Sequence, residues 1–161
     1  ICRIVIWVQI PKGIQMQISF NGIELLKEHE GFREKAYKDT GGVWTIGYGT
    51  IKWLGKPVEA GQTITDKEAL LALQADLAWA QTAVNQLVRV PLKQHMFDAL
   101  VSFVYNIGES AFSKSTMLRL LNEGKFDLAA EQFKRWNQDN GKVIPGLVSR
   151  RKVEESLFRG E

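Results

Sequence analysis

The chain has 161 residues, of which 45% are hydrophobic and 24% are charged, and five of its aromatic side chains are tryptophans. This length and composition are sufficient for a folded core, and they exclude an intrinsically disordered chain. The single cysteine, Cys2, excludes an internal disulfide. Neither Cys2 nor the two histidines, His29 and His95, has the spacing of a metal site, so we expect no metal and no cofactor.

The basic excess is small and unevenly distributed. Of the formal net charge of +3, Arg3 and Lys12 lie within residues 1–15, and the rest of the chain has 19 basic and 18 acidic residues. A basic cluster near the C-terminus is typical of a surface that meets an anionic polymer or lipid, and equally of a solvated helix face. We expect no nucleic-acid partner. The cluster comprises Lys142, Arg150, Arg151, Lys152 and Arg159.

The first fifteen residues differ in character from the rest. Residues 1–10 are apolar apart from Arg3 and Gln9, too short to span a bilayer and without the layout of a signal peptide. Met16 opens a sequence that reads like a natural start, so we interpret 1–15 as an extension and 16–161 as the domain proper. The extension weakly resembles antimicrobial peptides of the cathelicidin type. That resemblance implies a fused, membrane-active peptide, and the other interpretation is an inert extension.

The first part of the domain predicts a helix followed by a hairpin. Apolar residues recur at helical spacing in residues 22–30, after Asn21, and the helix ends near Gly31. Residues 36–51 are rich in aromatic and β-branched side chains. The Asp-Thr-Gly-Gly stretch at 39–42 interrupts them as a hairpin turn does.

The rest of the chain predicts helices. Thr65 and Glu68 form a capping box that opens a helix running to about Val88, roughly 35 Å at 1.5 Å per residue. After Pro91, which is placed to open a helix, the whole pattern is helical. The expected helices cover residues 92–106, 115–122, 127–136 and 149–158.

These elements predict an α+β fold that is mainly α. We expect a small helix-plus-hairpin lobe at 16–64, a connecting helix at 65–90 and a larger helical lobe at 91–161, with a groove between the lobes.

Two carboxylates are candidates for acid–base chemistry. Hydrolysis of a glycosidic bond needs one carboxylic acid to protonate the leaving oxygen and a second group to place a nucleophile or a water. Glu30 lies at the C-terminal end of a predicted helix, where the helix dipole disfavours ionisation and favours a role as general acid. Asp39 lies in the turn, near the hydroxyl of Thr45, in a setting suited to holding water. Taken alone, a Glu on a helix face and an Asp in a turn are more typical of solvation and turn chemistry.

The spacing of these three residues resembles that of a known family. Glu30, Asp39 and Thr45 lie in the stretch HEGFREKAYKDTGGVWTIGYGT, which is similar to the catalytic signature of phage-type lysozymes, the muramidase endolysins. The similarity continues through LVRVPLKQHMFDALVSFVYNIGESAF and GLVSRRKVEESLF, and so covers essentially the whole chain from Met16. It implies a lysozyme-like fold.

The resemblance implies a role for each signature residue. Glu30 becomes the general acid, Asp39 the residue that activates water, and Thr45 a second partner of that water, with inversion at the anomeric carbon. The family also pairs its catalytic Glu with an arginine of the closing helix, for which Arg150 and Arg151 both remain open. Such an arginine favours the ionised form of Glu30, whereas the helix dipole disfavours it. The net direction of the shift in the Glu30 pKa therefore stays open.

Candidate substrate-binding residues are suggested by their positions relative to the signature residues. They are Tyr48 and Gly49, which follow Thr45, Asn106 in the central turn, and the two arginines at 150 and 151. Trp136 is a further candidate, although a core position suits it better. The apolar pair at 53–54 and His29 beside the candidate acid have no role in the family pattern that we can assign.

The implied biology is that of an endolysin. The resemblance implies cleavage of the β-1,4 bonds between N-acetylmuramic acid and N-acetylglucosamine in peptidoglycan, leading to host lysis. It also implies synthesis in the host cytoplasm, release to the periplasm and cell wall through a separate pore-forming protein, and a monomer. The rival readings are a lytic transglycosylase, which has no use for a water-placing pair, a membrane-active protein acting through residues 1–15, and a catalytically inactive wall-binding module.

Overall fold

The computed structural model describes residues 15–161. The expected N-terminal extension, with both interpretations of it, therefore lies outside the described residues except for Gln15. Across the described part of the chain, no helix is long and apolar enough to cross a membrane.

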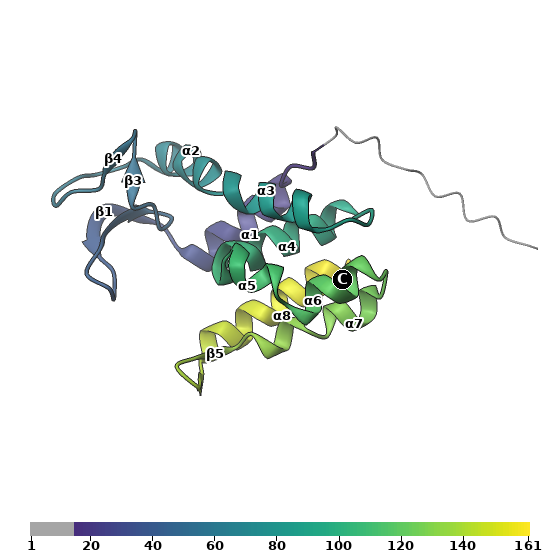
Figure 1. Ribbon diagram of the computed structural model, residues 1–161. Helices are drawn as coiled ribbons and strands as arrows, with labels where there is room; N and C mark the ends of the chain where they lie inside the picture. The colour runs from purple at the N-terminus through teal and green to yellow at the C-terminus, as the bar shows by residue number, and fades with distance from the viewer. Residues whose placement is uncertain (1–14) are drawn as a thin grey trace, which may run out of the picture.

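Within residues 15–161 the chain forms eight α-helices, one 3-10 helix and six short strands in three hairpins (Figure 1). This confirms the predicted α+β, mainly α fold. The helices are α1 (Phe20–Glu30), α2 (Asp66–Asp76), α3 (Ala78–Leu87), α4 (Gln94–Ile107), α5 (Glu109–Ser113), α6 (Thr116–Asn122), α7 (Phe126–Ala130), η1 (Phe133–Arg135) and α8 (Pro145–Arg159). The strands are β1 (Arg33–Lys38), β2 (Trp44–Gly47), β3 (Lys52–Trp53), β4 (Lys56–Pro57), β5 (Gln138–Asp139) and β6 (Lys142–Val143).

Helix α1 ends where the sequence predicts and begins slightly earlier. Its N-cap is Ser19 rather than Asn21, because the Ser19 hydroxyl accepts a hydrogen bond from the backbone N–H of Gly22. Its C-cap is Gly31, whose φ of +70° redirects the chain into β1. Glu30 is thus the last residue of a helix whose position is set by burial of Leu26.

The hairpin of β1 and β2 is antiparallel, as expected, with Tyr37 opposite Thr45 and Lys38 opposite Trp44. The Asp39 carboxylate closes the turn, because its Oδ1 accepts hydrogen bonds from the backbone N–H groups of Gly41 at 2.9 Å and Val43 at 2.8 Å.

The predicted connecting helix is divided into α2 and α3 at Leu77. The capping box of Thr65 and Glu68 opens α2 as predicted. Leu77 is fully buried, and its ψ of −13° tightens the turn there. The hydrogen bond from the Gln81 N–H to the Leu77 carbonyl nevertheless carries the helical path across the junction.

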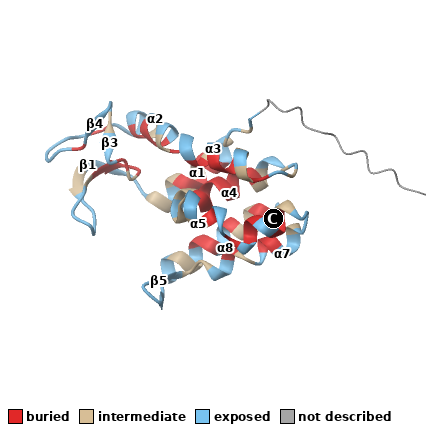
Figure 2. Cartoon of the chain, in the orientation of Figure 1, coloured by how far each residue is buried: buried red, intermediate tan, exposed pale blue. Residues whose placement is uncertain are grey.

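Helix α4 forms the centre of the helical part. Residues 97–104 are all buried, and α4 packs against α1, α3 and α8 (Figure 2). Helix α4 begins at Gln94 with Lys93 as N-cap, so Pro91 precedes the helix instead of opening it. Pro145 does hold that position in α8, which therefore starts four residues before the predicted Ser149.

The expectation of an entirely helical chain after Pro91 is wrong. Strands β5 and β6 form a hairpin there, and its turn residues Asn140 and Gly141 both have positive φ, as a tight hairpin turn requires. The Asn-Gly pair is a hairpin signal that the helical reading overlooked. The predicted helix at 127–136 is likewise replaced by α7 and η1, and α5 was not expected.

Two glycines within helices should respond oppositely to alanine. A Cβ at Gly22 would lie 2.6 Å from Ile18 and 2.8 Å from Asp98, whereas nothing lies within 4 Å of one at Gly146. We expect Gly22→Ala to lower the free energy of unfolding by about 1–3 kcal/mol through overpacking. Gly146→Ala should raise it by about 0.5 kcal/mol through helix propensity. Urea unfolding of both variants measures this, and equal effects would contradict the packing at Gly22.

Candidate functional site

Glu30 forms an ion pair with an arginine 120 positions along the chain. Its Oε1 accepts a hydrogen bond from Nη1 of Arg150 at 2.9 Å. The Arg150 side chain is 9% exposed and the Glu30 side chain 23%, so the pair is partly shielded and one edge of the carboxyl faces outward. Of the two arginines left open by the sequence, Arg150 is therefore the partner of Glu30.

A buried glutamate, Glu154, joins this pair into a larger cluster. Its Oε1 accepts hydrogen bonds from Nε of Arg150 at 3.2 Å and from the hydroxyl of Ser102 at 2.7 Å. Its Oε2 forms an ion pair with Nη1 of Arg151 at 3.0 Å, without hydrogen-bond geometry. Burial raises the pKa of Glu154, and the two arginines oppose that shift. The sequence reasoning missed Glu154, although its i+4 and i+3 spacing from the arginines signals contact on one helix.

Asp39 and Thr45 lie together at the turn end of the first hairpin. The Val43 carbonyl accepts hydrogen bonds from the Asp39 N–H at 2.9 Å and from the Thr45 hydroxyl at 3.1 Å. Because Tyr37 is opposite Thr45 and side chains alternate along a strand, Asp39 is a diagonal neighbour of Thr45 on the same face. Asp39 is exposed and Thr45 buried.

Gly49 borders the second oxygen of Glu30. A Cβ at this position would lie 3.7 Å from Glu30 Oε2, and the φ of +91° is one that glycine adopts readily. Tyr48 is 4% exposed, and its hydroxyl donates a hydrogen bond to Asp66. The structure thus gives Tyr48 a packing role, and its direct contact with substrate stays a prediction.

Tyr105 and Asn106, at the end of α4, lie on the helical side of the site. Burial raises the pKa of Tyr105, and the negative charges of Asp76 and Glu30 raise it further. Asn106 is exposed, and its Oδ1 accepts a hydrogen bond from Arg151. The Asn106 amide nitrogen makes no hydrogen bond within residues 15–161, so it is available to a ligand.

Other residues noted in the sequence lie elsewhere. Arg151 is 1% exposed, so its placement suits it to positioning Asn106 rather than meeting a ligand directly. Trp136 is partly buried and packs edge-on against Phe103 at the border of the core, with ring centroids 5.6 Å apart. Among the described residues, no three His, Cys, Asp or Glu side chains are grouped as metal ligands.

His29 is a half-buried base beside this charged cluster. Its Nε2 is buried and has no hydrogen-bond partner. Burial, together with the positive charges of Arg150 and Arg151, lowers the pKa of His29 to about 4. The imidazole is therefore neutral at neutral pH.

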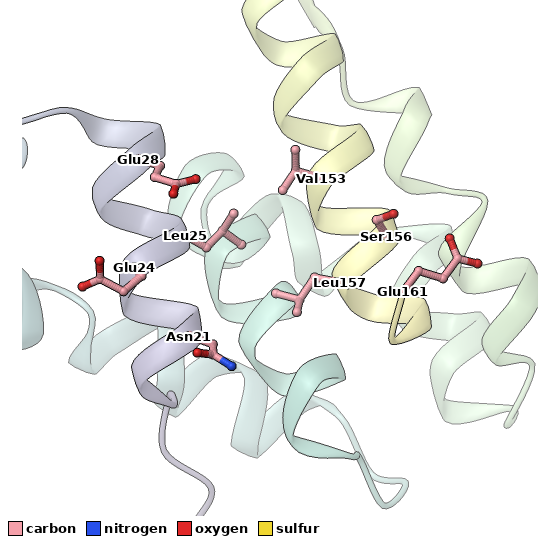
Figure 3. Close-up of a pocket in the computed structure, with 8 residues that line it drawn as sticks. All are labelled: Asn21, Glu24, Leu25, Glu28, Val153, Ser156, Leu157 and Glu161. Carbon is pink, nitrogen blue, oxygen red and sulfur yellow. The ribbon is translucent and has the colours of Figure 1, made fainter.

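A hollow of about 310 Å³ lies between α1 and α8 (Figure 3). Its floor is apolar and its rim carries carboxylates, and none of its residues is a predicted site residue. The lining residues are Asn21, Glu24, Leu25, Glu28, Val153, Ser156, Leu157 and Glu161.

Comparison with known proteins agrees on one family. The family model described as phage lysozyme matches residues 27–154. An endolysin of Salmonella phage P22 is 48% identical over 144 residues, covering 89% of this chain and 98% of that protein. An endolysin of Bacillus phage PZA is also 48% identical, and the match spans 55% of its length.

Solved structures give the same relationship. An endolysin from an Escherichia coli O157:H7 phage, FAHEc1, has a TM-score of 0.85 at 41% identity, covering 90% of this chain and 94% of that one. A P22 lysozyme mutant has a TM-score of 0.83 at 46% identity, with coverages of 89% and 99%.

The lowered pKa of His29 predicts a pH-dependent loss of stability. Above about pH 6.5 neither the folded nor the unfolded state protonates His29. Between about 6.5 and 4 only the unfolded state does, so stability falls as the pH falls. We expect this to amount to about 1 kcal/mol, since solvent screens a half-buried group. Urea unfolding at pH 7 and 4.5 should show a smaller loss for His29→Gln than for the wild type, and an equal loss would contradict the assignment.

Proposed function

This chain belongs to the phage lysozyme family, and on that basis we propose that Glu30, Asp39 and Thr45 carry out its reaction. The protein is an endolysin, a muramidase-type hydrolase that degrades peptidoglycan. The observation that carries the residue assignment is the Glu30–Arg150 ion pair, which fixes one oxygen of the carboxyl and leaves the other beside Gly49.

Glu30 acts as the general acid from a defined oxygen. Because Arg150 donates a hydrogen bond to Oε1, a proton on the carboxyl resides on Oε2, the oxygen beside Gly49. From there it passes to the glycosidic oxygen as the bond to the anomeric carbon breaks. The small Gly49 leaves room for a sugar to approach Oε2.

Asp39 and Thr45 hold the attacking water. Asp39 Oδ1 is occupied by two turn N–H groups, which leaves Oδ2 as an acceptor, and the Thr45 hydroxyl hydrogen is used on Val43. Thr45 Oγ1 can therefore only accept from the water. Both water protons then point to these two acceptors, and a lone pair is free to attack the anomeric carbon. Asp39 takes one proton as the new C–O bond forms.

This arrangement disfavours the rival transglycosylase chemistry. A transglycosylase closes its product internally and needs no water, whereas Asp39 and Thr45 share Val43 in a geometry suited to binding one. Attack by water from the face opposite the leaving group implies inversion, for which the Glu30 and Asp39 carboxyls should be about 6.5–9.5 Å apart.

We extend the proposal to the cellular setting. The enzyme acts on the cell wall after release, and we propose synthesis in the host cytoplasm, release through a separate pore-forming protein, and action as a monomer. Release of a form comprising residues 16–161 from cells that lack any pore-forming protein would contradict the proposal of such a partner.

Loss of Glu30 should abolish cleavage without unfolding the protein. We expect Glu30→Gln to lower peptidoglycan hydrolysis by at least about 10²–10⁴-fold, since the acid is lost. Glu24→Gln is the matched control, because Glu24 is a partly exposed carboxylate of α1 that pairs with Lys27, and this variant should stay active. Mass spectrometry of the released muropeptides gives the readout. Reducing N-acetylmuramic acid ends support the proposal, anhydro ends indicate a transglycosylase, and killing by Glu30→Gln without cleavage indicates membrane activity.

The stereochemistry of the product checks the water-binding pair. Proton NMR of fresh digests of a soluble glycan should show the α-anomer at the new reducing end before mutarotation. A β-anomer formed first would mean retention, and would make Asp39 a nucleophile instead of a water-binding base.

A further inference from the structure

Arg150 is shared between two carboxylates, and only one of them faces the outside. Its Nη1 donates to Glu30 at 2.9 Å and its Nε to Glu154 at 3.2 Å, while Nη2 donates to the Ser102 carbonyl at 3.3 Å. The guanidinium is thus held at all three nitrogens. Any change in one carboxylate alters how strongly the cation acts on the other.

Glu154 itself is out of reach of substrate. Its side chain is 0% exposed, and its oxygens are occupied by Ser102 and the two arginines. It nevertheless contacts Arg151, which binds the exposed Asn106. A carboxylate in this position affects the site through its neighbours and not through contact with the glycan.

We propose that Glu154 is a positioning residue that offsets the charge of Arg150 and thereby sets the pH at which Glu30 stops acting as the acid. The inference rests on the proposed role of Glu30. With Glu154 in place, part of the Arg150 charge is offset from the buried side, so the arginine holds the Glu30 carboxyl without forcing it to ionise. Without Glu154, the full cation stabilises ionised Glu30.

The groups around this cluster leave Glu154 as the main buried counter-charge. Helix α1 contributes Glu30 and His29, the latter neutral near pH 7 because its pKa is lowered to about 4. Helix α4 contributes the Ser102 and Tyr105 hydroxyls, and α2 contributes Asp76, whose carboxylate accepts from Thr50 at 2.7 Å. Two arginines thus face two close carboxylates, and one of those must exchange a proton during catalysis.

A buried salt bridge with a purely structural role would affect the stability of the fold without moving the pH dependence of the reaction. The two roles are therefore separable by the pH profile of kcat/KM. In the proposed mechanism Glu30 gives the alkaline limb of that profile, and Asp39 gives the acid limb.

Glu154→Gln keeps the shape of the side chain and removes its charge. We expect the alkaline limb to move to lower pH by roughly half a unit or more, with the acid limb unmoved. Glu155→Gln is the control, because it removes the same charge one residue along the helix, where Glu155 pairs with Arg159 at 2.8 Å. Its profile should match the wild type. Glu154→Asp, which keeps the charge, should restore the alkaline limb.

A second variant should shift the alkaline limb of the pH profile in the opposite direction. Arg151→Gln removes a cation that pairs with Glu154. More of the Glu154 charge then offsets Arg150, so the alkaline limb should move to higher pH. General damage to the fold would not produce shifts in opposite directions, and this variant tests the inference even if Glu154→Gln does not fold.

Carbon-13 NMR of the Glu30 carboxyl separates this inference from the proposed function. An unchanged ionisation pH of Glu30 in the folded Glu154→Gln variant, or in Arg151→Gln, overturns the inference. A shifted ionisation with an unmoved alkaline limb supports the link to Glu154 and overturns Glu30 as the acid.

Discussion

The ion pair between Glu30 and Arg150 is the constraint on which the site depends. It joins the last residue of α1 to the second turn of α8, two helices that both pack on the buried helix α4. Because residues 97–104 of α4 are buried, the relative position of the two helices is set by close packing, together with the hydrogen bond from Ser102 to Glu154. The carboxyl is consequently held by a rigid element and not by a loop.

Burying charges in this way is costly for the fold. Taking Arg150, Arg151 and Glu154 out of water costs free energy that their mutual attraction only partly offsets, and apolar replacements of such clusters are often neutral or stabilising. We infer that the cluster serves to orient Glu30 and Asn106. Each charged residue of the cluster contacts another. In addition, Arg150 contacts Glu30 and Arg151 contacts Asn106.

The other half of the site is built by different physics. Asp39 and Thr45 are oriented by hydrogen bonds between near neighbours in a single short hairpin. Gly49, which follows the same hairpin, then brings this local unit against Glu30. The acid, Glu30, is therefore positioned by a long-range contact between helices. The water-binding pair, Asp39 and Thr45, is positioned by a local turn that lies close to it.

The sequence by itself determined the local elements: the helix ending at Gly31, the hairpin around Asp39, the capping box at Thr65, and the spacing of three candidate residues. These follow from neighbours in the chain. The tertiary structure alone decided that Arg150 rather than Arg151 reaches Glu30, that Tyr48 packs in the core, and that Glu154 belongs to the site. Adjacent residues on a helix point about 100° apart, so their roles depend on how α8 is rotated against α4, and only packing fixes that rotation.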